Sequence, residues 1–412
     1  MRFDRQLLTM LLAGFSAGVP LFLVTKCLQA WFTQAGFSVA SVSFASLIAL
    51  PWSLKFLWAP LTDRLAPPGG RRRGWLLLLV LGLMLSLAGM SLQRPLGGAE
   101  LLVLNAVLIA LLSATQDVVV DAWRVEAFPG VAQQQGSTVY LFGYRAALVA
   151  TGGGGMWLAS DLGWPVIYLV MAGVQAIGLV AWWTMRETTA APPQSFRDAV
   201  VEPMREYQSR RSQRLILAVF AFAILYKLGD SLAGNVTTVF LLRDGGFSQK
   251  DLALIQNTWG LLATLIGVGL GGLGMLRLGL NRSLWIFGVL QGASNLAYAG
   301  LAQWGGGTGG LAAVVTIENL CGGLGTVAFV AFLSAECAPA YAATQFALLS
   351  SLMAAGRDGI ASTAGVLKEG LHLGWPGFFL LTAVAAIPGL LLLPVVAGWS
   401  TRPLADGTSS VR

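Results

Sequence analysis

Charged residues are scarce in this sequence. Asp, Glu, Lys and Arg make up only 11% of its 412 residues, whereas soluble domains carry about 25%. Because so few charges cannot cover the surface of a water-soluble protein of this size, a soluble fold is excluded. Hydrophobic residues reach 56% and the mean hydropathy is +0.70, which indicates the long apolar runs of a polytopic membrane protein.

Cysteine and histidine are also rare, which argues against disulfide, metal and enzyme chemistry. The three cysteines, Cys27, Cys321 and Cys337, lie in or at the ends of apolar segments without paired spacing, so they predict neither a disulfide framework nor a metal site. The one histidine, His372, falls in an expected loop. Since no G-x-S-x-G motif or Ser-His-Asp arrangement is apparent, we expect no catalytic residue, no metal and no bound cofactor.

Glycine, in contrast, is abundant, with 51 residues. Glycine runs at residues 152–155, 267–274 and 322–325 fall inside apolar segments, where small residues let helices approach closely. A phosphate cradle is not expected, because no Walker lysine follows these runs.

Twelve apolar stretches are close to the 20 residues that span a bilayer as a helix. The first stretch follows Arg2 and Arg5 in the manner of a signal peptide, but it is too long and lacks a small-x-small cleavage site, so we expect it to be retained. The expected spans are residues 6–33, 39–62, 74–93, 99–121, 138–160, 164–184, 214–242, 249–278, 281–303, 309–333, 342–369 and 374–398. The prediction is an all-α polytopic membrane protein.

The distribution of Lys and Arg predicts the orientation of these spans. With both termini in the cytoplasm, most of the 26 Lys and Arg residues fall in cytoplasmic segments, and only Arg94, Arg243, Lys250 and Lys368 fall in outside loops. The positive-inside rule therefore favours cytoplasmic N- and C-termini. Because this asymmetry accounts for the net charge of +7, no nucleic-acid partner is expected.

The longest polar stretch, residues 185–213, separates spans 1–6 from spans 7–12. It divides the chain into an expected N-terminal six-helix bundle (1–184), a cytoplasmic linker (185–213), a C-terminal six-helix bundle (214–398) and a cytoplasmic tail (399–412). The apolar linker residues that fall near one helical face are Phe196, Val200, Val201, Met204 and Tyr207. This pattern fits a short helix on the inner leaflet, and a solvated linker is an equal alternative.

Several short strings recur at about half the length of the chain. They are Gly36-Phe37-Ser38 with Gly246-Phe247-Ser248, Glu126-x-x-Pro129 with Glu336-x-x-Pro339, Arg145 with Arg357, and Leu162-Gly163-Trp164-Pro165 with Leu373-Gly374-Trp375-Pro376. The offsets lie between 210 and 212 residues, and each repeat holds six spans. Two bundles of like orientation around a central cavity are therefore expected, which is the major facilitator architecture.

The loop between spans 2 and 3 resembles the D-R-x-G-R-R signature of that superfamily. It contains Asp63-Arg64 and, after a Pro-Pro-Gly-Gly insertion, Arg71-Arg72-Arg73. In the superfamily this loop braces the cytoplasmic ends of the bundles through carboxylate and arginine contacts, so the resemblance implies a gating role for these residues. The alternative is that topology alone demands a basic loop here.

Charged residues also lie within the expected spans, where each costs at least about 2.5 kcal/mol and normally faces a partner or a wet cavity. The cations are Lys26, Lys55, Arg145, Lys227 and Arg357, and the acids are Asp117, Asp121, Asp230, Glu318 and Asp358. Fully ionised, these charges cancel. Protonation of one acid leaves the set net positive, which suits a carrier that takes up an anion together with a proton.

Spacing along the helices indicates which of these charges act together. Asp117 and Asp121 share a face of span 4, and Lys227 and Asp230 are placed for an ion pair in span 7. Asp121 lies near the end of its span, so its alternative role is an interfacial charge paired with Arg124.

Polar groups within the apolar spans are the candidate substrate contacts. They are Lys26, Gln29, Lys55, Gln116, Arg145, Lys227, Asn235, Glu318, Asn319 and Arg357. For Arg357 the alternative is a local structural pair with Asp358. The candidate proton carriers are carboxylates, because histidine is absent from the expected spans and arginine stays charged. They are Asp230 and Glu318, which lie deeper and are preferred, and Asp117 and Asp121.

Longer strings resemble the AmpG-type muropeptide permeases over spans 1 to 11. These strings are Gly14-Phe15-Ser16-Ala17-Gly18-Val19-Pro20, Leu28-Gln29-Ala30-Trp31, Leu54-Lys55-Phe56-Leu57-Trp58-Ala59-Pro60, Ala114-Thr115-Gln116-Asp117-Val118-Val119-Val120-Asp121-Ala122, Tyr226-Lys227-Leu228-Gly229-Asp230, Glu318-Asn319-Leu320-Cys321-Gly322-Gly323 and Ala343-Thr344-Gln345-Phe346-Ala347-Leu348-Leu349-Ser350.

The resemblance implies proton-dependent import of N-acetylglucosaminyl-anhydro-N-acetylmuramyl peptides across a Gram-negative inner membrane. In the family this import feeds cell-wall recycling and, in some bacteria, β-lactamase induction. The implied partners are a small anionic glycopeptide, protons and membrane lipid, and the superfamily default is a monomer. Many family members carry hydrophobic segments beyond the twelve-helix core, whereas this sequence ends at Arg412.

Other functional classes stay open, because a fold does not determine a substrate. One is a major facilitator carrier of a different anionic metabolite, such as acetyl-CoA. Another is a non-transporting substrate sensor, which would need an output domain that no polar segment is long enough to form. A membrane-embedded transferase would need a catalytic constellation that is not apparent in the sequence.

Overall fold

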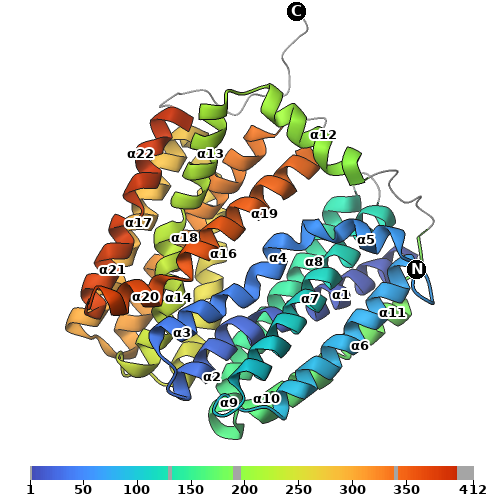
Figure 1. The fold of residues 1–412 in the computed structure, drawn as a ribbon, viewed down its shortest axis with the longest axis horizontal. Coiled ribbons are helices and arrows are strands. Elements are labelled where there is room, and N and C mark those ends of the chain that lie inside the picture. Colours follow the sequence, from blue (N-terminus) through green and yellow to red (C-terminus); the bar gives the residue numbers. More distant parts are fainter. Residues whose placement is uncertain (1, 129–131, 189–195, 338–341, 397–412) are drawn as a thin grey trace, which may run out of the picture. The chain divides into compact units, whose positions relative to one another are not determined.

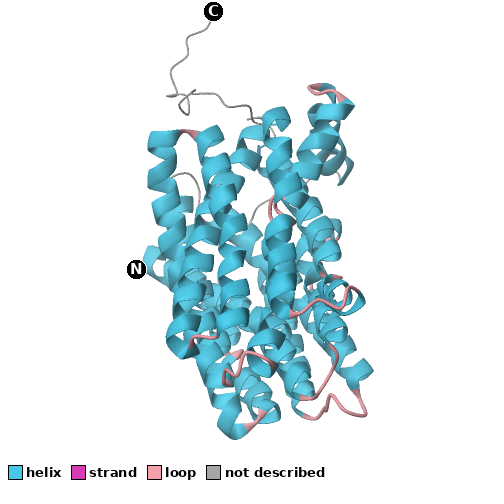
Figure 2. Cartoon of the chain, turned by 90° about the vertical axis from the view of Figure 1, so that its left-hand side faces the viewer, coloured by secondary structure: helices cyan, strands magenta, loops and turns pink. Residues whose placement is uncertain are grey.

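The computed structural model describes residues 2–128, 132–188, 196–337 and 342–396 (Figure 1). Within these ranges all regular elements are helices, and no strand occurs among them (Figure 2). The expected tail and the repeated prolines Pro129 and Pro339 lie outside the described residues. The prediction of an all-α protein is confirmed.

The helices of the first half form six long stretches and a linker helix. In chain order they are α1 (Arg2–Phe22), η1 (Leu23–Cys27) and α2 (Leu28–Gln34); α3 (Val39–Phe44), η2 (Ala45–Ala49), α4 (Leu50–Leu54), η3 (Lys55–Leu57) and α5 (Ala59–Arg64); α6 (Arg71–Ser91); α7 (Ala99–Ala127); α8 (Ala132–Leu148), η4 (Val149–Gly155) and α9 (Met156–Leu162); and α10 (Trp164–Val174) with α11 (Ile177–Thr184). The linker helix is α12 (Phe196–Ser209).

The second half repeats this pattern. Its stretches are α13 (Gln213–Leu225) with α14 (Leu228–Arg243); α15 (Gln249–Asp251), η5 (Leu252–Trp259) and α16 (Gly260–Leu278); α17 (Leu280–Trp304); α18 (Gly307–Glu336); α19 (Ala342–Ala361) with α20 (Ala364–Gly370); and α21 (Trp375–Val384) with α22 (Ile387–Val396). Within the described residues, 9 helical stretches are long and apolar enough to cross a membrane. The remaining stretches, 132–162, 280–304 and 342–370, are as long but more polar.

The chain divides into two compact units. Unit 1 comprises residues 1–38, 45–196 and 248–257, and unit 2 comprises residues 39–44, 197–247 and 258–412. Each unit therefore contains one short segment from the other half of the sequence. These segments are α3 in unit 2 and the α15–η5 region in unit 1.

Close backbone contact explains the place of α3 in unit 2. Gly365 of α20 has no side chain, and a Cβ there would lie 2.5 Å from the Cα of Ala40. The Ala40 N–H donates to Glu369 Oε1 (3.2 Å), and Ser43 Oγ donates to the carbonyl of Ser362 (2.8 Å). A side chain at position 365 would push α3 away from α20.

Polar contacts hold α15 and η5 in unit 1. The side-chain amide of Gln249 donates to the Met156 carbonyl (2.6 Å), and that of Asn257 donates to the Gly152 carbonyl (2.9 Å). Lys250 Nζ lies 2.9 Å from Asp161 Oδ1. This hydrogen bond from Lys250 lowers the pKa of Asp161, which is exposed at the end of α9.

Glycines set the helix spacing in the core of each unit, at Gly323 in one of the predicted runs and at Gly143 outside them. In unit 1 a Cβ at Gly143 of α8 would lie 2.2 Å from the Leu11 carbonyl oxygen of α1. In unit 2 a Cβ at Gly323 of α18 would lie 2.4 Å from the Thr264 carbonyl oxygen of α16. Such backbone approach is how small residues pack membrane helices.

The repeated Leu-Gly-Trp-Pro string has a structural role in both halves. Pro165 and Pro376 stand in the first turn of α10 and α21, two residues after Gly163 and Gly374 at the N-caps. Proline suits this position because its missing N–H would have no helical partner there. The repeat therefore marks the start of the last span in each half.

Candidate functional site

Unit 1 contains a charged cluster formed by η3 and α7. Lys55 Nζ lies 3.7 Å from Asp117 Oδ2 and 3.8 Å from Asp121 Oδ2. The Asp117 side chain is 9% exposed and the Asp121 side chain 40% exposed. The two carboxylates share a face of α7, as their spacing predicts, and one lysine contacts both.

Two further side chains complete this cluster. Tyr140 of α8 donates from its hydroxyl to Asp117 Oδ1 (3.3 Å). Arg124 lies 3.1 Å from Asp121 Oδ1, and its guanidinium stacks 5.5 Å from the centre of the Tyr140 ring. Arg124, the partner predicted for Asp121, is therefore present, and Lys55 is a second partner that the sequence does not predict. Two cations face two carboxylates, so the ionised cluster has no net charge.

Unit 2 contains a second cluster around Lys227, which lies between α13 and α14. Its Nζ donates to Gln291 Oε1 (2.9 Å), Thr326 Oγ1 (3.0 Å) and the Gly322 carbonyl (3.2 Å). Asp230 Oδ2 is 3.9 Å from the same nitrogen. The amide nitrogen of Gln291 donates to Asp230, so Gln291 connects the lysine to the aspartate.

Sequence reasoning selected Lys227 and Asp230 but missed Gln291 and Thr326. Gln291 is 2% exposed within α17. The criterion that selected Gln29 and Gln116, an amide inside an apolar span, applies equally to Gln291. Thr326 gives no such signal, because a threonine in a membrane helix usually bonds its own backbone, and Thr326 also donates to the Gly322 carbonyl.

Other candidates in unit 2 lie near this cluster or form local pairs. The charges of Arg357 and Glu318 lie close enough to act on Lys227. Arg357 also forms the expected local pair with Asp358, at 2.8 Å. Asn319 Nδ2 donates to Glu318 Oε2 (2.6 Å) and to the Val315 carbonyl (2.9 Å). Neither pair excludes a substrate contact, because Glu318, Arg357 and Asp358 all remain partly exposed.

The structure places the remaining candidates in different settings. Gln116 is fully buried in unit 1, where its amide nitrogen donates to Ser16 Oγ (2.9 Å). This is a packing contact, so the geometry gives no support to its predicted role as a substrate contact. Gln29 is 4% exposed, and its Oε1 has no hydrogen-bond partner among the described residues. Lys26, Arg145 and Asn235 are partly buried in η1, α8 and α14.

The predicted gating loop forms a compact charged contact in unit 1. Glu126, at the end of α7, accepts from Arg72 NH2 (2.6 Å) and Arg71 NH2 (3.1 Å), and Thr188 donates to its other oxygen. The Glu187 carboxylate accepts from the backbone N–H groups of Arg72 (2.8 Å) and Arg73 (2.9 Å). It thus caps the first turn of α6, where a negative charge is favourable.

The two acids in this contact were not assigned to gating from the sequence. In the sequence, Glu126 belongs to the repeated Glu-x-x-Pro string, and Glu187 falls in the linker. Arg64 is exposed in the last turn of α5. For Asp63 the structure describes the backbone but not the side chain.

Glu336, the repeat equivalent of Glu126, forms the corresponding contact in unit 2. Arg211 donates to Glu336 Oε2, and the Tyr207 hydroxyl of α12 donates to the same atom (3.5 Å). The pKa of Tyr207 is raised to about 12, mainly by burial and secondly by the negative charge of Glu336. The linker residues 196–209 form the helix α12, so the helical part of that prediction is confirmed. Met204 and Tyr207, which belong to the apolar face expected on the inner leaflet, pack instead against the core of unit 2.

Within the part of the chain that the structure describes, no group of three or more His, Cys, Asp or Glu residues is placed to hold a metal ion. Each unit instead carries charges inside apolar helices, balanced by opposite charges and amides. Charges placed in this way mark solute or proton pathways in membrane proteins. The class defined by this fold and these clusters is a polytopic transporter.

Comparison with known proteins identifies the family. Residues 7–357 match the Major Facilitator Superfamily. The chain is 42% identical to the anhydromuropeptide permease of Escherichia coli K12, over 94% of this chain and 78% of that protein. It is 30% identical to putative transporter AmpG 4 of Rickettsia conorii, over 95% of this chain and 96% of that protein. The chain therefore belongs to the Major Facilitator Superfamily and, within it, to the AmpG-type permeases.

A solved structure shares the fold. A bacterial homolog of the human lysosomal transporter Spinster superimposes with a TM-score of 0.70 over 97% of this chain and 96% of that chain, at 16% identity. At this identity the likeness concerns the fold alone. The predictions of family and fold are confirmed, and family membership makes the chain a multi-pass membrane transporter and not an enzyme.

Proposed function

We propose that the chain is a proton-coupled inner-membrane importer of anhydro-muropeptides, which works by alternating access and serves cell-wall recycling. The observation that carries this proposal is the 42% identity to an anhydromuropeptide permease over 94% of the chain. In an organism with a muropeptide-responsive β-lactamase, the same import would supply the inducing signal. The expected energy source is the proton gradient, with no bound cofactor.

The charged clusters suit an anionic substrate. Anhydro-muropeptides carry carboxylates and many hydroxyl groups, which ammonium, guanidinium and amide groups bind well. Lys55 and Lys227 supply cations within units 1 and 2, and each is already balanced by carboxylates. A substrate carboxylate competes for these cations best when a protein carboxylate is protonated. This competition gives a physical basis for taking up substrate and proton together.

Asp230 is our preferred proton carrier, with Glu318, Asp117 and Asp121 as the other candidates. Contact with Lys227 at 3.9 Å stabilises the ionised form of Asp230. A conformational change that draws Lys227 toward a substrate carboxylate removes this stabilisation and favours protonation. Gln291 contacts both residues, so it transmits a movement of one to the other.

The arginine contacts at Glu126 and Glu336 are proposed to act in gating. Both acids end long helices, α7 and α18, and both bind arginines from a neighbouring loop or helix. On the expected orientation, with both termini in the cytoplasm, these contacts lie on the cytoplasmic side. There they would favour one conformation of each unit and break as the carrier opens.

An exchange experiment tests the substrate class. Proteoliposomes loaded with unlabelled N-acetylglucosaminyl-anhydro-N-acetylmuramyl tripeptide should take up the labelled compound from outside without any imposed gradient. Excess unlabelled anhydro-muropeptide should block this uptake, and excess acetyl-CoA should not. Block by acetyl-CoA alone would favour a carrier of another anionic metabolite, and binding without exchange would favour a sensor.

A further inference from the structure

The two segments that each unit takes from the other half of the sequence begin after the same repeated string. The helix α3 follows Gly36-Phe37-Ser38, and α15 follows Gly246-Phe247-Ser248. Gly36 and Gly246 have positive φ angles of 88° and 73°, which glycine adopts without strain. In each half, this turn therefore ends the preceding helix and starts the exchanged segment at an equivalent position of the repeat.

Both exchanged segments end where the helix changes its winding. The first boundary between the units lies between Phe44 and Ala45, where the 3₁₀ turn η2 begins. The second lies between Asn257 and Thr258, inside the π-helix η5. Such turns within a long helix often mark functional positions and hinges. Each segment is therefore joined to the rest of its own span by a turn that suits a hinge.

A directed chain of hydrogen bonds holds α15 in unit 1. The Trp164 indole N–H donates to Gln34 Oε1 (2.7 Å), and the Gln34 amide donates to Gln249 Oε1 (2.6 Å). The Gln249 amide in turn donates to the Met156 carbonyl (2.6 Å). Because an indole can only donate and a carbonyl can only accept, the two ends of the chain determine the orientation of both amides. Gln249 is 7% exposed, so loss of its bonds leaves polar groups poorly solvated.

A charged contact lies beside this chain and stays open to solvent. Lys250 Nζ is 2.9 Å from Asp161 Oδ1 and 4.9 Å from the centre of the Trp157 ring. The side chains of Lys250 and Asp161 are 42% and 52% exposed, and exposed ion pairs are weak. This contact can therefore break and form again at little cost. On the expected orientation, with both termini in the cytoplasm, this end of unit 1 faces outside.

The same construction occurs in both halves, with a turn before each exchanged segment and a change of helical winding after it. We propose that residues 249–257 form an outer gate, which is closed in this structure and held by the chain from Trp164 to Met156. The gate opens when α15 leaves unit 1 by rotation at η5. This inference rests on the proposed import function, because an importer must admit its substrate from the outer side.

Distances between spin labels test whether the segment moves. Nitroxides are attached to the full-length protein at Leu92→Cys, after α6, and Leu254→Cys, in η5, both of which are exposed. The native cysteines are first replaced by alanine. Double electron–electron resonance should show one main distance and a minor second one. Gln249→Leu removes two bonds of the chain and should raise the minor population about tenfold. Trp164→Phe should raise it less, and Trp375→Phe, at the repeat-equivalent position, should leave it unchanged.

A reversible tether tests whether transport needs this movement. Asp161→Cys and Lys250→Cys are joined by a bis-methanethiosulfonate reagent with a spacer about as long as the ion pair that it replaces. The tether should abolish exchange of labelled N-acetylglucosaminyl-anhydro-N-acetylmuramyl tripeptide in proteoliposomes, and a reductant should restore it.

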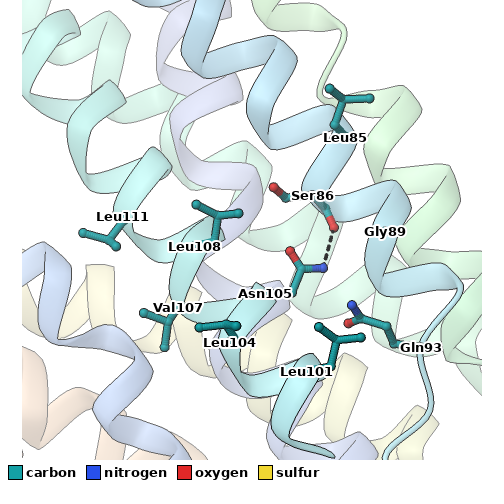
Figure 3. A pocket seen from close by; sticks show the side chains of 10 residues that line it. All are labelled: Leu85, Ser86, Gly89, Gln93, Leu101, Leu104, Asn105, Val107, Leu108 and Leu111. Atoms are coloured by element: carbon teal, nitrogen blue, oxygen red, sulfur yellow. Dashed lines mark hydrogen bonds between the residues drawn. The ribbon is translucent and has the colours of Figure 1, made fainter. Parts of the chain in front are cut away.

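The control tether joins Gly89→Cys to Asn105→Cys across the groove between α6 and α7 (Figure 3). A Cβ at position 89 would lie 3.4 Å from Asn105 Nδ2, so a short tether reaches. Both helices belong to the first half of the chain and to unit 1. Exchange should therefore continue through the control tether.

The two measurements separate the gate from the proposed function. Absence of exchange in the untreated protein would contradict the import function, and the spin-label distances would still test the gate. Exchange at the full rate through the tether between positions 161 and 250 would overturn the gate. So would a distance distribution that Gln249→Leu leaves unchanged, or one that Trp375→Phe changes equally.

Discussion

At the scale of single residues, the arrangement around Lys227 carries the most chemical information. The lysine has three hydrogen-bond acceptors from α17 and α18 in addition to Asp230. On the proposed coupling mechanism, these neutral acceptors would keep the ammonium satisfied when Asp230 is protonated. Lys55 in unit 1 lies between two carboxylates instead, so the two clusters are not chemically equivalent.

Asp230→Asn separates proton coupling from substrate binding. Asparagine resembles the protonated acid, so exchange of labelled for unlabelled substrate between equal pools should continue. Accumulation driven by a pH gradient should fall to the level of protein-free liposomes. Both are measured as uptake into proteoliposomes.

The matched control is Asp244→Asn, which changes an exposed acid at the C-cap of the same helix, α14. It should behave as the wild type in both assays. If Asp230→Asn still accumulates substrate along a pH gradient, Asp230 is not the coupling residue, and Glu318 becomes the first alternative.

At the scale of helices, the acid at the end of α7 holds the start of α6. Arg72 is 3% exposed, and Glu126 is its carboxylate partner. Glu126→Ala would leave this buried guanidinium without that partner, which costs about 3–5 kcal/mol of unfolding free energy. Thermal or denaturant unfolding of the purified protein measures the loss.

Glu100→Ala, at the exposed opposite end of α7, is the control, and it should cost less than about 1 kcal/mol, because it removes only an exposed charge in the first turn of the helix. Equal stability of the two variants would show that the Glu126 contact does not hold α6 in place.

Two adjacent glycines of α18 test how closely this helix packs against α16. Gly323→Ala places a Cβ 2.4 Å from the Thr264 carbonyl oxygen, whereas Gly322→Ala meets no atom within 4 Å. The first variant should lose about 1–3 kcal/mol through overpacking. The second should be neutral or slightly stabilised, because alanine favours the helix. Unfolding measurements that rank the two variants in the opposite order would contradict the observed packing.

The contact between α9 and α15 predicts a pH dependence of stability. The hydrogen bond from Lys250 lowers the pKa of Asp161 below its unfolded value of about 3.9. A lowered carboxyl pKa stabilises the fold above the unfolded value, and this contribution is lost as the pH falls through the folded value. Wild type should therefore be more stable than Lys250→Gln at pH 7, and the difference should shrink as the pH falls through the lowered pKa of Asp161 to the part that the contact of Lys250 with the Trp157 ring contributes. A difference that grows on acidification would contradict this sign.

At the scale of the whole molecule, the sequence was sufficient to predict the fold class and the position of each helical stretch. Apolar length determines where a chain can cross a bilayer, and this information is local. The Leu-Gly-Trp-Pro strings begin α10 and α21, as helix-start chemistry requires. The family also followed from strings such as those around Asp117 and Lys227.

The partners of the site residues were less predictable. The sequence places Gln116 among the candidate substrate contacts, and in the structure its buried amide donates to Ser16, a partner that the sequence does not indicate. The contact between Gln291 and Lys227 joins α17 to the α13–α14 turn. Such partners depend on how helices pack and rotate, which hydropathy does not encode.

The central claim is that this transporter couples a proton gradient to the uptake of anhydro-muropeptide. The direct measurement is uptake of labelled N-acetylglucosaminyl-anhydro-N-acetylmuramyl tripeptide into proteoliposomes, with and without an acidic exterior. With the gradient, the internal concentration should rise above the external one, and a protonophore should abolish this excess. If uptake stops at equal concentrations whether or not the gradient is present, the transporter is not proton-coupled.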